Sequence, residues 1–108
     1  MGMKTFTNNT GSALQVYLFV RAGSNPGCIR RRIGFTLIAN ESKTIAYGSD
    51  TDPFLDGILA YQNSNGQYIC TKMCVTARGS AADNLLNTNN TILFSLTNSS
   101  IVITAQNI

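Results

Sequence analysis

The segment from Leu55 to Val75 contains the strongest β-hairpin signal in the chain. Two runs of β-favouring residues flank a turn that ends in Asn65-Gly66. Asn-Gly is typical of hairpin turns because both residues tolerate a positive φ. A turn of two or of four residues assigns the same side chains to the same face. One face then carries Ile58, Ala60, Gln62, Ile69, Thr71, Met73 and Val75, and the other carries Leu59, Tyr61, Tyr68, Cys70, Lys72 and Cys74.

The segment from Ala13 to Arg21 shows the clearest alternation of apolar residues. One face, which belongs in a core, carries Leu14, Val16, Leu18 and Val20. The opposite face carries Gln15, Tyr17, Phe19 and Arg21. Two aromatic rings make that second face more apolar than a solvated surface requires. We therefore expect something to cover it or to bind there.

Five further segments, residues 4–10, 28–38, 43–48, 91–97 and 101–106, also have the composition or alternation of strands. The single helical signal is Ser80 followed by Asp83, which fits a capping box and predicts one or two turns. Turn signals recur about every 8 to 14 residues and no crossover helix separates the strands. Residues 1–108 therefore predict one all-β domain, an antiparallel β-sandwich or jelly roll of about eight short strands. A partly closed β-barrel is the alternative.

The segment 28–38 combines an apolar face with three consecutive arginines. Ile33, Phe35 and Leu37 share a face that extends back to Arg31. Because a charge does not belong in a core, we expect the strand to emerge or to bulge near Arg31. Gly34 is expected to serve a bend in the same strand.

The composition favours a surface or assembly protein over a metabolic enzyme. Charged residues make up 12% of the chain, and Asn, Thr and Ser together account for 33 of 108 residues. The expected surface is polar mainly through amides and hydroxyls, which suits an extracellular, virion or assembly surface and leaves the location open. No apolar run approaches the length of about 18 residues of a membrane span, and the sequence shows no signal peptide.

The chain contains no histidine, which excludes Ser-His, Cys-His and histidine-metal mechanisms. We therefore expect a protein that is not an enzyme and has no cofactor. Asp50, Asp52 and Asp56 lie close together in the sequence and are weak candidates for a calcium loop, because Ca²⁺ prefers flexible oxygen ligands. The favoured interpretation is that these residues promote turns and caps.

A basic patch occurs at Arg30, Arg31 and Arg32. A stripe that also included Arg21, Lys72 and Arg78 near the tyrosines would suit single-stranded nucleic acid, which needs phosphate contacts and stacking. The alternative is that consecutive arginines alternate between faces, where they are solvated or protect a sheet edge. We favour this alternative, so nucleic acid is the less favoured partner.

Three cysteines, Cys28, Cys70 and Cys74, cannot all pair within one chain. On a regular strand Cys70 and Cys74 lie about 13 Å apart, beyond the roughly 7 Å limit between the Cα atoms of a disulfide. Reduced thiols are the simplest expectation. A bridge from Cys28 to either partner and an intermolecular bridge both stay open.

If the hairpin and the segment 13–21 share a sheet, their second faces form one amphipathic surface. It carries Tyr17, Phe19, Leu59, Tyr61, Tyr68 and Lys72. Rings supply contact area and hydroxyls supply hydrogen bonds, as at protein interfaces and sugar platforms. The alternative is that this surface packs inside the sandwich. The predicted function is a non-catalytic interaction or self-assembly module that forms homo-oligomers or binds a protein partner, with a lectin-like module that binds carbohydrate or a membrane as the alternative.

Overall fold

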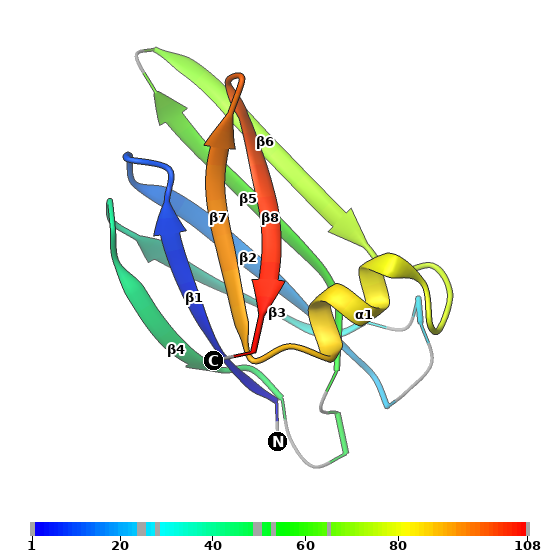
Figure 1. Ribbon diagram of the computed structural model, residues 1–108. Helices are drawn as coiled ribbons and strands as arrows, with labels where there is room; N and C mark the ends of the chain where they lie inside the picture. The colour runs from blue at the N-terminus through cyan, green and yellow to red at the C-terminus, as the bar shows by residue number, and fades with distance from the viewer. Residues whose placement is uncertain are drawn as a thin grey trace.

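The computed structural model describes residues 2–23, 26–27, 29–48, 51–52, 54–64 and 66–107. These residues form eight β-strands and one short helix (Figure 1). The elements are β1 (Met3–Asn9), β2 (Leu14–Arg21), β3 (Ile29–Leu37), β4 (Ser42–Ala46), β5 (Leu55–Ser64), β6 (Gln67–Cys74), α1 (Ala81–Asn87), β7 (Thr91–Thr97) and β8 (Ser100–Gln106).

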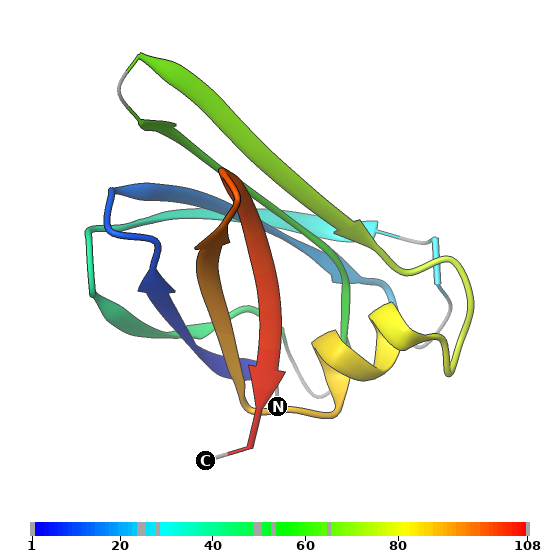
Figure 2. The ribbon, with the colours of Figure 1, turned by 45° about the horizontal axis from the view of Figure 1, so that its top comes forward.

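The strands build two four-stranded sheets, with the orders β4-β1-β7-β8 and β3-β2-β5-β6. Figures 1 and 2 show the sheets as two layers, with α1 at one end of them. The hairpin of β5 and β6 extends beyond the other strands at the opposite end. The predicted two-sheet β-sandwich is confirmed. The described strands pair only within each sheet, so they do not form the barrel that was the alternative.

The strand directions differ from the prediction in one pair. β1 and β7 run parallel, with Thr5 beside Thr91, which makes their sheet mixed. All pairings in the other sheet are antiparallel. The prediction of a wholly antiparallel sandwich, and of a jelly roll in that sense, is therefore wrong. Two parallel neighbouring strands are not joined by a short turn, so no local sequence motif predicts that they pair.

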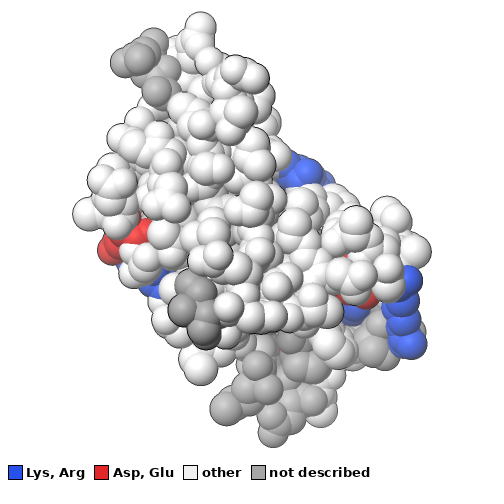
Figure 3. Space-filling view, in the orientation of Figure 1, with Lys and Arg blue, Asp and Glu red and all other residues white. Residues whose placement is uncertain are grey.

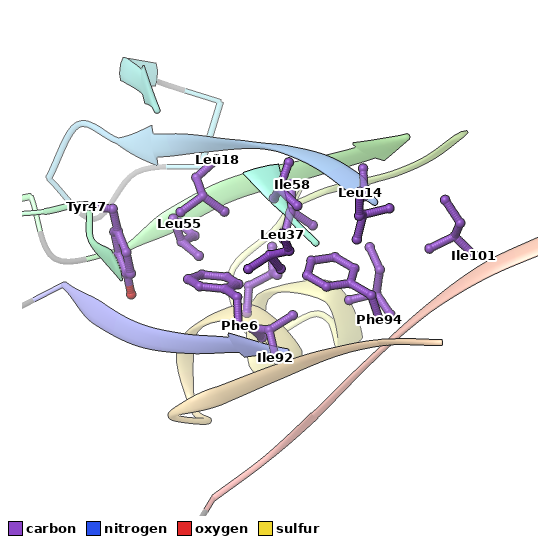
Figure 4. Packing of buried hydrophobic residues seen from close by; sticks show 14 of the residues in the cluster. Phe6, Leu14, Leu18, Leu37, Tyr47, Leu55, Ile58, Ile92, Phe94 and Ile101 are labelled. Carbon is purple, nitrogen blue, oxygen red and sulfur yellow. The ribbon is translucent and has the colours of Figure 1, made fainter. Parts of the chain in front are cut away.

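The core lies between the two sheets and follows the predicted alternation. The four apolar residues on the inner face of β2 are fully buried, as are Phe6, Ile92 and Phe94 in the other sheet. Figure 4 shows the rings of Phe6 and Phe94 lying between the layers, opposite Leu14 and Leu37. Each fully buried side chain of this size contributes roughly 1.5–3 kcal/mol, so this layer drives folding.

Leu96 is an exception to the alternation of burial along β7. The alternation of β7 places it inward with Ile92 and Phe94, but it is 39% exposed. β1 pairs with β7 only as far as Ser95, so Leu96 extends past the end of its neighbouring strand. Burial therefore ends where the sheet narrows, although the alternation continues.

The hairpin predicted at Asn65-Gly66 has a two-residue turn, and a second hairpin with a two-residue turn joins β7 and β8. Ser64 pairs with Gln67, and Gly66 has a φ of 79°. Asn65 lies outside the described residues. In the second hairpin, Asn98 and Ser99 have φ values of 50° and 64°. Two successive positive φ values match the turn that suits the twist of paired strands.

The end of β2 is irregular on both sides. β3 and β5 each contain one extra residue opposite this end, Arg30 and Asp56. The irregularity in β3 adjoins Arg31, where a bulge was predicted. Beside these register shifts, the Arg21 side chain is only 2% exposed, although the alternation predicts it on the outer face.

Helix α1 begins at the predicted cap. The Ser80 hydroxyl accepts a hydrogen bond from the Asp83 backbone N–H at 3.3 Å, and the Asp83 carboxylate accepts one from the Gly79 N–H at 2.9 Å. Buried Leu86 anchors the helix to the core. No helix in the described ranges is long and apolar enough to cross a membrane.

Candidate functional site

The outer face of the β3-β2-β5-β6 sheet gathers the residues that the sequence predicted as an interaction surface. Strand register places Tyr17 beside Leu59, and Leu59 beside Lys72. The inner face of the same strands carries core residues such as Val16 and Ala60. The alternative that this surface packs between the sheets is therefore wrong. We call it the aromatic face, and define it by Tyr17, Phe19, Leu59, Tyr61, Tyr68, Lys72 and Arg32.

Three tyrosine rings form a row across the aromatic face. The ring centroids of Tyr17 and Tyr61 are 6.1 Å apart, with the planes inclined by 21°. Tyr61 and Tyr68 follow at 6.4 Å and 43°. The hydrogen-bonding interaction with Tyr17, together with desolvation and neighbouring tyrosines, raises the pKa of Tyr61. Tyr68 ends the row and is 76% exposed, so the row is open to solvent at the β6 edge.

Glycines make room for the rings. A Cβ on Gly34 would lie 2.7 Å from Cε1 of Tyr17, its cross-strand neighbour. A Cβ on Gly57 would lie 3.4 Å from Cδ2 of Phe19 and 3.0 Å from a backbone oxygen. The Tyr17 ring covers Gly34, so this glycine allows the close approach of a ring.

Two cations lie over rings of the aromatic face. The Arg32 guanidinium carbon is 5.3 Å from the centroid of Tyr17, and Lys72 Nζ is 5.7 Å from that of Phe19. These distances suit cation–π contacts. Within the described part of the chain, no carboxylate lies within ion-pair distance of either cation. The aromatic face therefore carries only positive charge.

The predicted basic patch does not act as one unit. Arg30 pairs with Asp52 at 3.3 Å, and Arg31 donates from Nε and one terminal nitrogen to the Tyr47 carbonyl at 3.1 and 2.8 Å. Only Arg32 joins the aromatic face. Arg21 is buried in ion pairs, so the continuous stripe considered for nucleic acid is not formed.

The calcium candidates have other partners. Asp52 accepts from the Gly23 N–H at 2.7 Å and pairs with Arg30. Asp56 accepts from the Gly27 N–H at 3.0 Å and from Arg21 at 3.2 Å. Asp50 lies outside the described residues, among which no three potential metal ligands cluster. The carboxylates of Asp52 and Asp56 therefore accept hydrogen bonds from loop backbone N–H groups and form ion pairs with arginines.

The two placed cysteines, Cys70 and Cys74, are exposed and unpaired on the outer face of β6. Their side chains share the face that carries Lys72, as the alternation predicted. Cys28 lies outside the described residues. The thiols of β6 therefore adjoin the aromatic face and are available to solvent.

Sequence reasoning missed a buried charge network at the other end of the sheet. Arg21 contacts Asp56 at 3.2 Å and Asp83 at 3.0 Å. A hollow of about 360 Å³ lies beside it, lined also by Phe54 and Asn87. The only sequence signal was the arginine at the end of an apolar strand, and alternation assigned it to the surface.

No protein family, curated protein or solved structure matches the chain. The functional argument therefore depends on the geometry of the molecule itself.

Proposed function

We propose that the protein is a non-catalytic interaction module that self-associates through the aromatic face, as a structural or surface-assembly component. The observation that supports this is the gathering of four rings and Leu59 on the outer side of one sheet. A sheet face exposed only to water gains no stability from four clustered rings. Tyr and Arg are, by contrast, enriched at protein interfaces.

The charge of the aromatic face is compatible with contact between two copies. Arg32 and Lys72 lie over rings of their own chain. A second copy would meet their alkyl stems as well as their charges. The chain as a whole has only 12% charged residues and a net charge of +3, so long-range repulsion between copies is small. The like charges of Arg32 and Lys72 on both copies are a further reason to expect weak association.

The size of the aromatic face predicts a weak association. Four strands about 4.8 Å apart, with four rows of side chains about 6.7 Å apart, cover roughly 500 Å². Stable interfaces bury about 800 Å² of accessible surface on each partner. We therefore expect a dimer that forms at high concentration and dissociates on dilution.

The test is sedimentation velocity over a wide concentration range, with reductant present to exclude disulfide links. The wild type is expected to shift from monomer to dimer, and Tyr61→Asp with Tyr68→Asp is expected to stay a folded monomer. Val102→Asp with Thr104→Asp is the matched control, because both residues are exposed on β8 in the other sheet. Figure 3 shows that side of the molecule, where charged groups are few. A wild type that stays monomeric, or a double Tyr variant that still associates, would contradict the proposal.

A lectin-like function is the second candidate. It is favoured by a hollow at one end of the aromatic face, where rings meet amide and hydroxyl groups.

A further inference from the structure

A hollow of about 170 Å³ lies at the end of the aromatic face nearest the β5–β6 turn. Its lining includes Gln15, Thr36, Tyr61, Asn63 and Tyr68. A cavity of about 150 Å³ is enough to hold benzene, so this hollow has room for one six-membered ring. The lining comes from four strands, which fix its shape.

The lining of the hollow is uncharged but rich in hydrogen-bonding groups. The Thr36 hydroxyl donates to Oε1 of Gln15 at 2.7 Å. This bond orients the Gln15 amide, and its Nε2 group has no acceptor among the described residues. Amides both donate and accept, as do the hydroxyls of Thr36 and Tyr68. A ligand with several neutral hydroxyls matches this set.

Two rings supply the apolar wall of the hollow. Tyr61 and Tyr68 are inclined by 43° with centroids 6.4 Å apart, so they present surfaces in two directions. The face of an aromatic ring carries partial negative charge and attracts the positive edge of C–H groups. A pyranose has one face lined by C–H groups and a rim of hydroxyls, so it can meet the rings and the amides at once.

No charged side chain lines this hollow, and the cation of Lys43 beside it is already hydrogen-bonded to the Thr36 carbonyl at 2.8 Å. Arg32 is four residues from Thr36 along β3, or about 13 Å, and Lys72 is four residues from Tyr68 along β6. Both side chains lie over other rings of the aromatic face, Arg32 over Tyr17 and Lys72 over Phe19, and neither belongs to the lining. A neutral ligand in this hollow needs no contact with either cation.

We propose that this hollow is a binding subsite for an uncharged pyranose unit, held by stacking on Tyr61 and Tyr68 and by hydrogen bonds to Gln15, Thr36 and Asn63. The subsite goes beyond the self-association proposed above and occupies only the uncharged end of the aromatic face. A single shallow subsite binds weakly, and glycans that present several units would bind more tightly through multivalency.

The test is a titration of ¹⁵N-labelled protein, at a concentration at which sedimentation shows a monomer, with the methyl glycosides of glucose, galactose, mannose and N-acetylglucosamine, followed by amide chemical shifts. At least one glycoside is expected to shift the amides of the five lining residues and to leave those of β8 unchanged. Gln15→Leu is expected to weaken binding about tenfold by removing hydrogen bonds. Tyr68→Ala is expected to do the same by removing the ring, whereas Thr104→Val, on the other sheet, is the control.

An array of immobilised neutral oligosaccharides tests whether the ligand is a unit of a glycan chain and not a free sugar. Binding to the array that is lost in Gln15→Leu would support the subsite as well as binding of a glycoside would. The inference is overturned if no glycoside and no array glycan binds, or if binding is unchanged in both variants. It is also overturned if a single-stranded oligonucleotide shifts the same amides in place of the sugars. Sedimentation of Gln15→Leu separates the two proposals, because this variant keeps the rings and should still self-associate.

Discussion

Arg21, the last residue of β2, is ion-paired with Asp83 of α1 at 3.0 Å. The same guanidinium is 3.2 Å from Asp56 and donates to the Leu55 carbonyl at 3.2 Å. The side chain is 2% exposed, so its charge is balanced by these partners and not by water. This network ties the helix to the end of the sandwich and explains why an apolar strand ends in arginine.

Replacing Arg21 tests the network directly. Arg21→Met keeps an unbranched side chain, shorter than that of arginine, but leaves Asp56, which is 6% exposed, without its cation. Loss of one partner of a buried pair costs about 3–5 kcal/mol. We expect a drop of that size in the free energy of unfolding, measured with urea.

Lys43→Met is the matched control for Arg21→Met, because Lys43 pairs with Glu41 at 3.9 Å on the surface. Exposed pairs contribute about 0–1 kcal/mol. Equal losses in the two variants would show that the Arg21 network does not stabilise the fold more than a surface pair.

Acidification should weaken the same network through Asp83. Burial raises the pKa of Asp83, but hydrogen bonds from Gly79, Asn87 and Arg21 and the charge of Arg21 outweigh it, so the pKa lies below its usual 3.8. A pKa lowered by folding means that the carboxylate stabilises the protein above about pH 4 and that this contribution is lost as the pH falls through the folded pKa.

The measurement is the free energy of unfolding from pH 6 to pH 2 for the wild type and Asp83→Asn. The variant should be less stable near pH 6, and the gap should narrow toward pH 2. A gap that stays constant with pH would count against a role for the Asp83 charge.

The sequence allowed the aromatic face to be predicted because β-strand alternation is local. Tyr17, Tyr61 and Lys72 follow from parity and from one Asn-Gly turn, and none of them depends on distant packing. The placement of Arg21 could not be predicted in this way. Arg21 is buried against Asp56 and the Leu55 carbonyl of β5 and against Asp83 of α1. These partners are more than 30 residues away in the sequence, so the alternation of β2 contains no information about them.

Local sequence patterns also could not predict the direction of strand pairing or the point along a strand at which burial ends. The parallel pairing of β1 with β7 joins strands that are connected only through the rest of the chain. Leu96 is exposed because its neighbour β1 ends first, and the alternation of β7 contains no information about the length of another strand. The hollow beside Tyr68 likewise exists only once four strands are aligned.

Gly34 should be essential to the arrangement of the aromatic face. In Gly34→Ala the new Cβ would lie 2.7 Å from Cε1 of Tyr17, so the ring must move. The movement should disturb the contacts of Tyr17 with Arg32 and Tyr61. We expect a changed near-ultraviolet tyrosine signal and a loss of about 1–3 kcal/mol in the free energy of unfolding.

Thr36→Ala, two residues along the same strand, is the control for Gly34→Ala. It removes a hydroxyl without placing an atom against a ring. If both variants keep the wild-type tyrosine signal, Gly34 is not needed to hold the ring of Tyr17 in place.

Asn8 and Gln62 are both buried amides in one hydrogen-bonded cluster, yet their removal should have opposite effects. Nδ2 of Asn8 donates to the Ser12 and Leu37 carbonyls at 2.7 and 3.0 Å, and Oδ1 accepts from the Thr10 N–H at 2.9 Å. Asn8→Leu leaves these backbone groups without partners. Each unsatisfied buried group costs about 1–3 kcal/mol, so this variant should be strongly destabilised.

Gln62 differs because its Nε2 has no partner among the described residues, although the side chain is 2% exposed. Its Oε1 lies 2.9 Å from the Thr10 hydroxyl, which can donate to Asn8 at 2.6 Å instead. Gln62→Leu removes the unpaired group and keeps the volume, so we expect stability equal to or above that of the wild type. Urea unfolding of both variants is the measurement. A loss in Gln62→Leu as large as that in Asn8→Leu would show that the Gln62 amide has a stabilising partner in the folded protein.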